Sequence, residues 1–234
     1  HTFQQTGNAG VSTNSEAVVS DLSVIVNEDG TYTIDGNFDA LSDGELATVT
    51  FQYTARDDSG TDNAVSEPKT VTLTVTGTND QPIVENVAIS ATETAGIEEI
   101  YAGTLVLSED LDTTDTHTFQ QLGNAEVSTN SEAVVSDLSV VVNADGTYTI
   151  DGNFDALANG ELATVTFQYT ATDDSGSENS VSEVKTVTLT VTGTNDQPVI
   201  TSLSDETALE VSENTSDETN ITTITENFVV NDID

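Results

Sequence analysis

A near-identical internal repeat constrains this chain more than any other feature. Residues His1–Pro82 recur as His117–Pro198, at an offset of 116 residues and without a gap. Eleven of the 82 compared positions differ, for example Arg56, which becomes Thr172. A unit of 116 residues is domain-sized and long enough to bury its own core. We therefore expect tandem domains cut from a longer array: 1–82 as the C-terminal part of one repeat, 83–198 as a complete repeat, and 199–234 as the N-terminal part of a third.

Short runs of alternating apolar and polar residues within the complete repeat predict β-strands. The two clearest runs are 164–169, with Val165, Phe167 and Tyr169 on one face, and 187–191. Others are 87–91, 101–107, 138–142 and 148–150. Asp145-Gly146 between two runs predicts a hairpin turn. No segment keeps a helical period, so the expected fold class is all-β, with Ig-like β-sandwich repeats joined end to end.

The charge is strongly acidic, with 42 acidic residues, three basic residues and a net charge of −39. Such a chain cannot neutralise phosphates, so we expect no nucleic-acid partner and no direct contact with an anionic membrane. Self-repulsion of this size must be offset by cations, either diffuse or bound. A solvated acidic surface is the alternative interpretation.

The chain has no cysteine, methionine or tryptophan. Disulfides therefore cannot stabilise it, which leaves core burial and metal ions. No apolar run approaches the length of a membrane-spanning helix, and no signal peptide is visible. We expect an internal piece of a longer exported protein.

Acidic residues concentrate at predicted turns, which a solvated surface alone would not require. Asp110, Asp112 and Asp115 precede His117, Glu161 follows Asn159-Gly160, Asp173-Asp174 precede Ser-Gly, and Asn195-Asp196 precede Gln-Pro198. Calcium takes six to eight hard oxygen ligands, which Asp-rich loops supply. The loop from Asp110 is not an EF-hand, because positions six and twelve are Asp115 and Gln121. A polar loop capped by aspartates remains the alternative.

Catalytic and zinc sites find little support. There is one histidine per repeat, His1 and His117, and no cysteine, so zinc is not expected. No nucleophile, base and orienting group can be assembled from the serines. Paired carboxylates could serve a glycosidase, but near-identical repeats without an aromatic-lined cleft favour a structural role. We expect no enzyme.

Several motifs together resemble cadherin-like and VCBS-type repeats of large bacterial adhesins of the RTX type, which are exported by type I secretion. Val211-Ser-Glu213-Asn214, followed by Asn231-Asp232-Ile-Asp234, is similar to the opening of a cadherin repeat. Thr172-Asp-Asp-Ser-Gly176 and the Asn195-Asp196-Gln-Pro198 linker resemble its end. The run Tyr148–Gly176 is similar to VCBS-type repeats. The resemblance spans the whole repeat.

This resemblance implies calcium clusters at each junction between repeats, with ligands from both neighbours. It implies a first cluster from Asp43, Glu45, Asn79, Asp80, Asp110, Asp112, and Asp173 or Asp174. It implies a second cluster from Glu93, Asn159, Glu161, Asn195, Asp196, Asp232 and Asp234. Asp57, Asp58, Asp115 and Glu213 complete the candidate ligands. The replacement of Asp43 by Asn159 lowers the ligand charge at the second junction, and one ion per junction is as tenable as three.

The function that the resemblance implies is an extender of an extracellular adhesin at the bacterial cell surface. Calcium would stiffen the junctions, the partners would be neighbouring repeats of the same chain, and the role would be attachment or biofilm formation. Two alternatives remain. The repeats could bind a polysaccharide or cell-surface glycan, although few aromatic residues are available for sugar stacking. They could also form a filament in which strands pass between chains.

Overall fold

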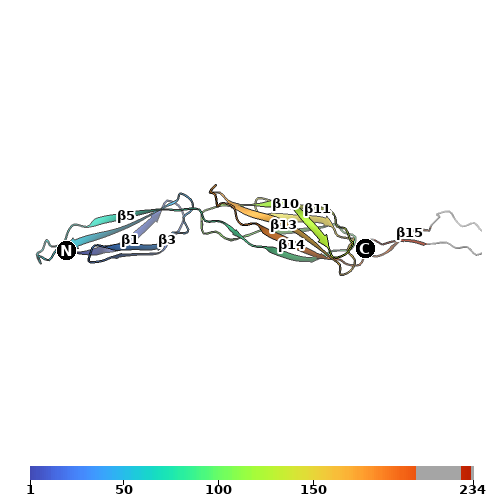
Figure 1. The fold of residues 1–234 in the computed structure, drawn as a ribbon, viewed down its shortest axis with the longest axis horizontal. Coiled ribbons are helices and arrows are strands. Elements are labelled where there is room, and N and C mark those ends of the chain that lie inside the picture. Colours follow the sequence, from blue (N-terminus) through green and yellow to red (C-terminus); the bar gives the residue numbers. More distant parts are fainter. Residues whose placement is uncertain (204–227, 233–234) are drawn as a thin grey trace, which may run out of the picture.

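The computed structural model describes residues 1–203 and 228–232, and its regular secondary structure consists of β-strands (Figure 1). None of the described residues lies in a helix. Accordingly, the described part of the chain contains no helix of the length and apolarity needed to cross a membrane. The chain is therefore all-β, as the alternating pattern predicts.

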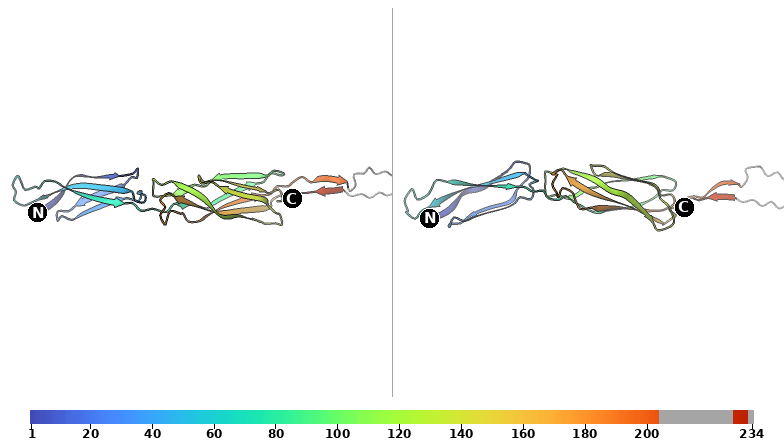
Figure 2. Two further views of the ribbon diagram at one scale, coloured as in Figure 1. Left: turned by 90° about the horizontal axis from the view of Figure 1, so that it is seen from above. Right: turned by 45° about the horizontal axis from the view of Figure 1, so that its top comes forward.

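The two large segments, residues 1–82 and 83–198, lie end to end along the long axis (Figures 1 and 2). We call them the first and second segments. The first contains β1 (Thr2–Thr13), β2 (Ser20–Val26), β3 (Tyr32–Asn37), β4 (Leu46–Arg56) and β5 (Lys69–Thr76). The second contains β6 (Ile83–Val84), β7 (Val87–Thr92), β8 (Glu99–Thr104), β9 (Leu107–Glu109), β10 (His117–Thr129), β11 (Ser136–Val142), β12 (Thr147–Asn153), β13 (Leu162–Asp173) and β14 (Lys185–Thr192).

Two sheets enclose the core of the second segment. One has the order β10-β13-β14-β7 and the other β11-β12-β8. All neighbours are antiparallel except β14 and β7, which run parallel with Leu189 opposite Ile89. Alternate residues of β13 and β14 point inward and meet residues of β12, as the period of two requires. Fully buried side chains such as Val165, Tyr169 and Ile150 form one continuous core between the sheets.

The first segment repeats part of this arrangement with fewer strands. Its sheets have the orders β1-β4-β5 and β2-β3. The register of β1 on β4 pairs Thr2 with Arg56, and the register of β10 on β13 pairs Thr118 with Thr172. Among the described residues, β5 and β3 lack the neighbours that β7 and β8 provide in the second segment. Its buried cluster is correspondingly small: Ala17, Leu41 and Ala47.

A further strand pair projects beyond the second segment. β15 (Val199–Leu203) pairs antiparallel with β16 (Phe228–Asn231), with Val199 opposite Asn231. The short pair β6 and β9 has a related register, with Ile83 opposite Glu109. Both pairs immediately follow an Asn-Asp-Gln-Pro linker.

Most predicted strands of the second segment are confirmed, with three differences. The longest strand, β10, is not among the predicted runs, because its apolar residues do not alternate cleanly around the bulge between Leu122 and Glu126. The run 101–107 is divided into β8 and β9, since Leu105 turns into the core and is 1% exposed. Two-residue β6 is too short to carry a periodic signal. The hairpin turn at Asp145-Gly146 is confirmed: Gly146 has φ +84° and donates to the carbonyl of Asn143.

Candidate functional site: the junction between the segments

The linker after β5 is held by loops of the second segment. The Asp80 N–H donates to Asp112 Oδ2 at 2.6 Å, and Asn79 Nδ2 donates to Asp173 Oδ2 at 3.1 Å. Asn179 Nδ2 donates in return to the Asn79 carbonyl at 2.7 Å. These contacts bring the linker onto the loop after β9 and the loop after β13. Residues far apart in the sequence thus share one polar region, which we call the junction.

A turn of the first segment reaches the same region. Thr114 Oγ1 donates to Glu45 Oε1 at 2.9 Å and lies 2.7 Å from Ser42 Oγ. On the linker side, Gln81 Nε2 donates to the Val181 carbonyl at 2.5 Å. The junction is therefore bridged on two sides, by the linker and by the turn at Glu45.

The backbone explains why Glu45 points here. The turn closes with the Glu45 N–H on the Ser42 carbonyl at 3.0 Å, and Glu45 Oε2 accepts the Ser42 N–H at 3.1 Å. The Gly77 N–H donates to the Glu45 carbonyl at 2.8 Å and fastens the turn to the start of the linker. Glu45 is thereby fixed beside the residues that follow β5.

The loop after β9 is similarly folded on its own side chains. The Asp112 N–H donates to Asp110 Oδ1 at 3.0 Å, and the Asp115 N–H donates to the Asp112 carbonyl at 3.1 Å. The other carboxylate oxygen of Asp110, Oδ2, lies 2.7 Å from His117 Nε2. Short polar side chains often close loops in this way. The result is three carboxylates on one short loop, of which Asp112 contacts the linker.

Two carboxylates and one amide of the junction are buried more deeply than such polar groups normally are. Asp112 is 1% exposed, Asp173 6% and Asn79 9%. Within the described structure, Asp112 Oδ1, Asp115 Oδ2 and Asn79 Oδ1 are buried and have no hydrogen-bond partner. A buried polar oxygen without a partner costs about 1–3 kcal/mol, and a charged one more. The junction therefore has oxygens that require a donor or a cation.

The pKa values of three junction aspartates are also raised, which agrees with their burial. Burial raises the pKa of Asp112 to about 6, opposed by the Asp80 N–H and reinforced by the charges of Asp115, Asp80 and Asp110. Burial also raises the pKa of Asp80, with Asp39 and Asp110 adding to the effect. Burial raises the pKa of Asp115, a hydrogen bond from Ser42 lowers it, and the charges of Asp173, Asp174 and Asp110 raise it further. Like charges concentrated in a poorly solvated region disfavour their own ionised forms.

The donor set fits a hard divalent cation in chemical type. Carboxylate, amide and backbone oxygens are the ligands that calcium takes. The chain has no sulfur-containing residue, and of its two histidines it is His117 that contacts the loop after β9. In the described structure no three His, Cys, Asp or Glu side chains are already grouped as a metal site. Binding would thus require these carboxylates to rotate toward a common point.

The candidate ligands at the first junction divide into two groups. The structure brings together Glu45, Asn79, Asp80, Asp110, Asp112, Asp115 and Asp173. Asp43 is exposed on the turn, and Asp174 is exposed and accepts the Thr116 N–H at 2.9 Å. Asp57 and Asp58 belong to the loop after β4, at the opposite end of the first segment (Figure 1), where Asp57 accepts from Ser59. Their role as ligands stays a prediction, because none of the four lies among the buried carboxylates of this junction.

At the second junction, the described residues are mainly those of the second segment and its linker. Glu93 is 3% exposed, and its Oε1 accepts from the N–H and, at 2.6 Å, from the hydroxyl of Thr194. Glu161 Oε2 accepts from Ser131 Oγ at 2.9 Å. Glu93 Oε2 is buried without a hydrogen-bond partner in the described structure. Asp196 is buried, whereas Asn159, Asn195 and Asp232 are exposed. Glu213 and Asp234 lie outside the described residues.

Sequence reasoning missed the neutral residues of the first junction. Thr114, Ser42 and Asn179 each bridge the two segments by a hydrogen bond. Their only signal is position, because each lies next to an acidic residue in a predicted turn. Ser42 also differs from its counterpart Ala158, so the two junctions differ in more than the charge of Asp43 and Asn159.

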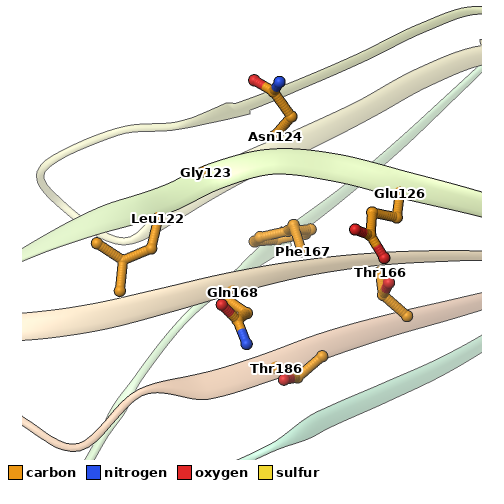
Figure 3. Close-up of a pocket in the computed structure, with 8 residues that line it drawn as sticks. All are labelled: Leu122, Gly123, Asn124, Glu126, Thr166, Phe167, Gln168 and Thr186. Atoms are coloured by element: carbon orange, nitrogen blue, oxygen red, sulfur yellow. The ribbon is translucent and has the colours of Figure 1, made fainter.

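A hollow on the outer face of the β10-β13-β14-β7 sheet offers little chemistry. It is formed around the bulge at Gly123, with Leu122, Glu126, Gln168 and Thr186 among its lining residues (Figure 3). Glu126 is the only ionisable residue that lines it. General acid–base catalysis by a carboxylate pair therefore has no basis there. The junction remains the region where side-chain chemistry concentrates.

Comparison with known proteins adds no assignment to this geometry. No protein-family model matches the chain, and neither does any curated protein.

Proposed function

We propose that this chain is a series of calcium-stiffened extender repeats of a bacterial cell-surface adhesin. In this proposal the units are cadherin-like β-sandwiches of 116 residues, the partners are neighbouring repeats, and the protein acts outside the cell in attachment or biofilm formation. The supporting observation is Asp112, a carboxylate that is 1% exposed, bonded to the linker through Oδ2 and unpartnered at Oδ1.

An ion with ligands from both segments would fix the orientation of one segment relative to the other. Glu45, Asn79 and Asp80 belong to the first segment and its linker, whereas Asp110, Asp112 and Asp173 belong to the second. A cation held by both sets fixes the angle between segments, because bending would separate its ligands. Without the cation, the same carboxylates repel one another across the linker. Binding to the aligned, folded state also stabilises that state by mass action.

The hydrogen bonds already present would cooperate with the ion. Asn179, Gln81 and Thr114 hold the two segments together without using charge. Each such bond contributes only about 1 kcal/mol net. They can orient the carboxylates, but a net charge of −39 works against them at low ionic strength. The cation supplies the counter-charge that the three basic residues cannot.

The test is thermal unfolding combined with small-angle X-ray scattering of the 234-residue chain. Calcium should raise the melting temperature and narrow the distribution of particle lengths toward an extended rod, relative to excess chelator at equal ionic strength. Magnesium should be much less effective, because it keeps its waters and demands strict octahedral geometry.

Two results would count against the proposal. Equal effects of calcium and of matched sodium chloride would mean that the acidic residues are a solvated surface. A calcium effect on melting without any change in shape would place the ion within a segment instead of at the junction.

A further inference from the structure

The sequence contains one Asn-Gly pair, Asn159-Gly160, and the structure places it in the exposed turn that precedes β13. Each of the other asparagines of the chain precedes a residue that has a Cβ. The backbone nitrogen that follows an asparagine can attack the side-chain amide carbon, and a glycine leaves this nitrogen unhindered and its backbone conformationally free. By its chemistry, this pair is the position of the chain most open to spontaneous deamidation.

The turn is closed by its own backbone and fastened to the start of the linker. The Glu161 N–H donates to the Ala158 carbonyl at 2.9 Å, and Gly160 has φ +84°. The Gly160 N–H donates to the Gly193 carbonyl at 3.0 Å, and the Gly193 N–H donates in return to the Glu161 carbonyl at 2.9 Å. The nitrogen that would attack Asn159 is therefore held by the residue that follows β14.

We propose that Asn159 is a site of spontaneous deamidation whose rate is set by the contact between this turn and Gly193. While the Gly160 N–H is bonded to the Gly193 carbonyl, its nitrogen cannot turn toward Asn159 Cγ, and the reaction is slow. When the contact opens, the nitrogen loses its proton to hydroxide and attacks Cγ; a C–N bond forms and ammonia leaves. Water then opens the succinimide at either of its two carbonyls, which gives aspartate or isoaspartate at this position.

The first segment shows that the aspartate product fits the turn. Asp43-Gly44 has the same place in the repeat, with Gly44 at φ +74° and its N–H on the Gly77 carbonyl at 3.2 Å. The Glu45 N–H closes this turn on the Ser42 carbonyl at 3.0 Å. Deamidation to aspartate would therefore give the second segment the acidic turn of the first. The isoaspartate product should instead break the contact with the linker, because its main chain is one carbon longer.

The experiment follows the 234-residue chain during incubation at mildly alkaline pH, folded and in concentrated urea, with peptide mapping by mass spectrometry. The replacement of an amide by a carboxyl group is read from the mass of each fragment, and an isoaspartyl methyltransferase detects the isoaspartate fraction. In urea, Asn159 should react faster than every other asparagine. In the folded chain it should react at least about fivefold more slowly than in urea, the factor that corresponds to one net hydrogen bond.

Two glycine variants test the role of the contact. In Gly193→Ala the added methyl group would overlap backbone carbonyls of the turn, so the linker must move away and Asn159 should react faster in the folded chain. Gly77→Ala is the matched control, because it creates the same kind of overlap in the first segment and should leave the rate at Asn159 unchanged. If Gly193→Ala does not fold, hydrogen exchange of the Gly160 amide in the unaltered chain replaces it: over low urea concentrations, the deamidation rate should rise in proportion to the exchange rate.

Several results would each overturn the proposal. They are faster reaction of another asparagine in urea, equal rates at Asn159 in the folded and unfolded chain, equal rates at Asn159 in the two glycine variants, and a deamidation rate that does not follow exchange of the Gly160 amide. All incubations contain chelator, so the reaction is measured without calcium. The inference goes beyond the proposed function and does not rest on it, so neither outcome bears on the melting and scattering experiment.

Discussion

Replacement of Asp112 by asparagine should raise the melting temperature without calcium and lower it with calcium. Its carboxylate is buried, and one oxygen has no partner within the described structure. Asp112→Asn keeps an oxygen to accept the Asp80 N–H but removes the buried charge. In chelator the variant should therefore melt a few degrees higher, because about 1 kcal/mol corresponds to roughly 2–8 °C for domains of this size. In calcium it should melt lower and bind the ion roughly tenfold or more weakly.

Calorimetry and calcium titration check both halves of this expectation. Glu126→Gln is the matched control, since it removes one exposed charge from the same segment. A variant of Asp112 that is less stable in both conditions would show that the carboxylate serves the apo fold instead of an ion.

The same residue predicts the pH dependence. Its folded-state pKa of about 6 lies above the value near 3.9 of an unfolded aspartate. The folded chain therefore binds more protons between these values, and the free energy of unfolding in chelator should increase, on the order of 1 kcal/mol, as pH falls from 7 to about 4.5. Asp80 and Asp115, whose pKa values are also raised, add to this trend.

With calcium, the free energy of unfolding should instead decrease as the pH falls, because protons compete with the ion for the same oxygens. Melting curves at pH 7, 6 and 5 with calcium and with chelator measure both slopes. Asp112→Asn should flatten the chelator curve. A chelator curve that already falls between pH 7 and 5 would contradict the argument, since carboxylates with lowered pKa values, such as Asp145, lose their contribution only at lower pH.

At the scale of elements, Gly77 should be the residue that positions the turn of Glu45. A Cβ on Gly77 would lie 2.2 Å from the Leu41 carbonyl oxygen and 2.3 Å from that of Ser42. Backbone atoms cannot yield as a flexible side chain does, so Gly77→Ala should destabilise the first segment by about 2 kcal/mol. It should also weaken calcium binding by moving Glu45.

Chemical denaturation and calcium titration measure the two effects of Gly77→Ala. Gly10→Ala is the control, because its added methyl group would meet only Thr50 Oγ1 at 3.7 Å and the counterpart position holds Glu126. Equal losses in both variants would remove the special role of Gly77.

The elements also show what can be predicted from a sequence of this kind. Strands such as β13 and β14 are predictable because one face is buried and the alternation is clean. The approach of Asp110 and Asp112 to Asp80 was implied only by a family resemblance, since local patterns do not encode which loops meet across a junction. The bridges from Thr114 and Asn179 were not predicted at all, because a neutral side chain in a polar turn carries no distinctive pattern.

At the scale of the whole molecule, the two segments are a natural experiment in which nearly the same strands have different neighbours. β3 and β12 share the sequence Tyr-Thr-Ile-Asp-Gly-Asn, yet β12 lies between two strands and β3 has one neighbour in the described structure. β5 and β14 differ in the same way. Intrinsic exchange rates are set by local sequence, so any difference in protection must come from tertiary structure.

Amide hydrogen exchange should therefore be at least about tenfold faster in β3 and β5 than in β12 and β14, a difference of about 1.4 kcal/mol in opening free energy. β4 and β13 are the internal control, because both have a neighbouring strand on each side. β4 lies between β1 and β5, and β13 lies between β10 and β14. If only β3 and β5 exchange faster than their counterparts, the first segment frays at these edge strands while β4 stays folded. If β4 also exchanges faster than β13, the whole first segment opens as a unit, because its buried cluster is too small to hold it. Equal protection in all three pairs would contradict the argument, because it would mean that a second neighbouring strand does not slow the opening of these strands.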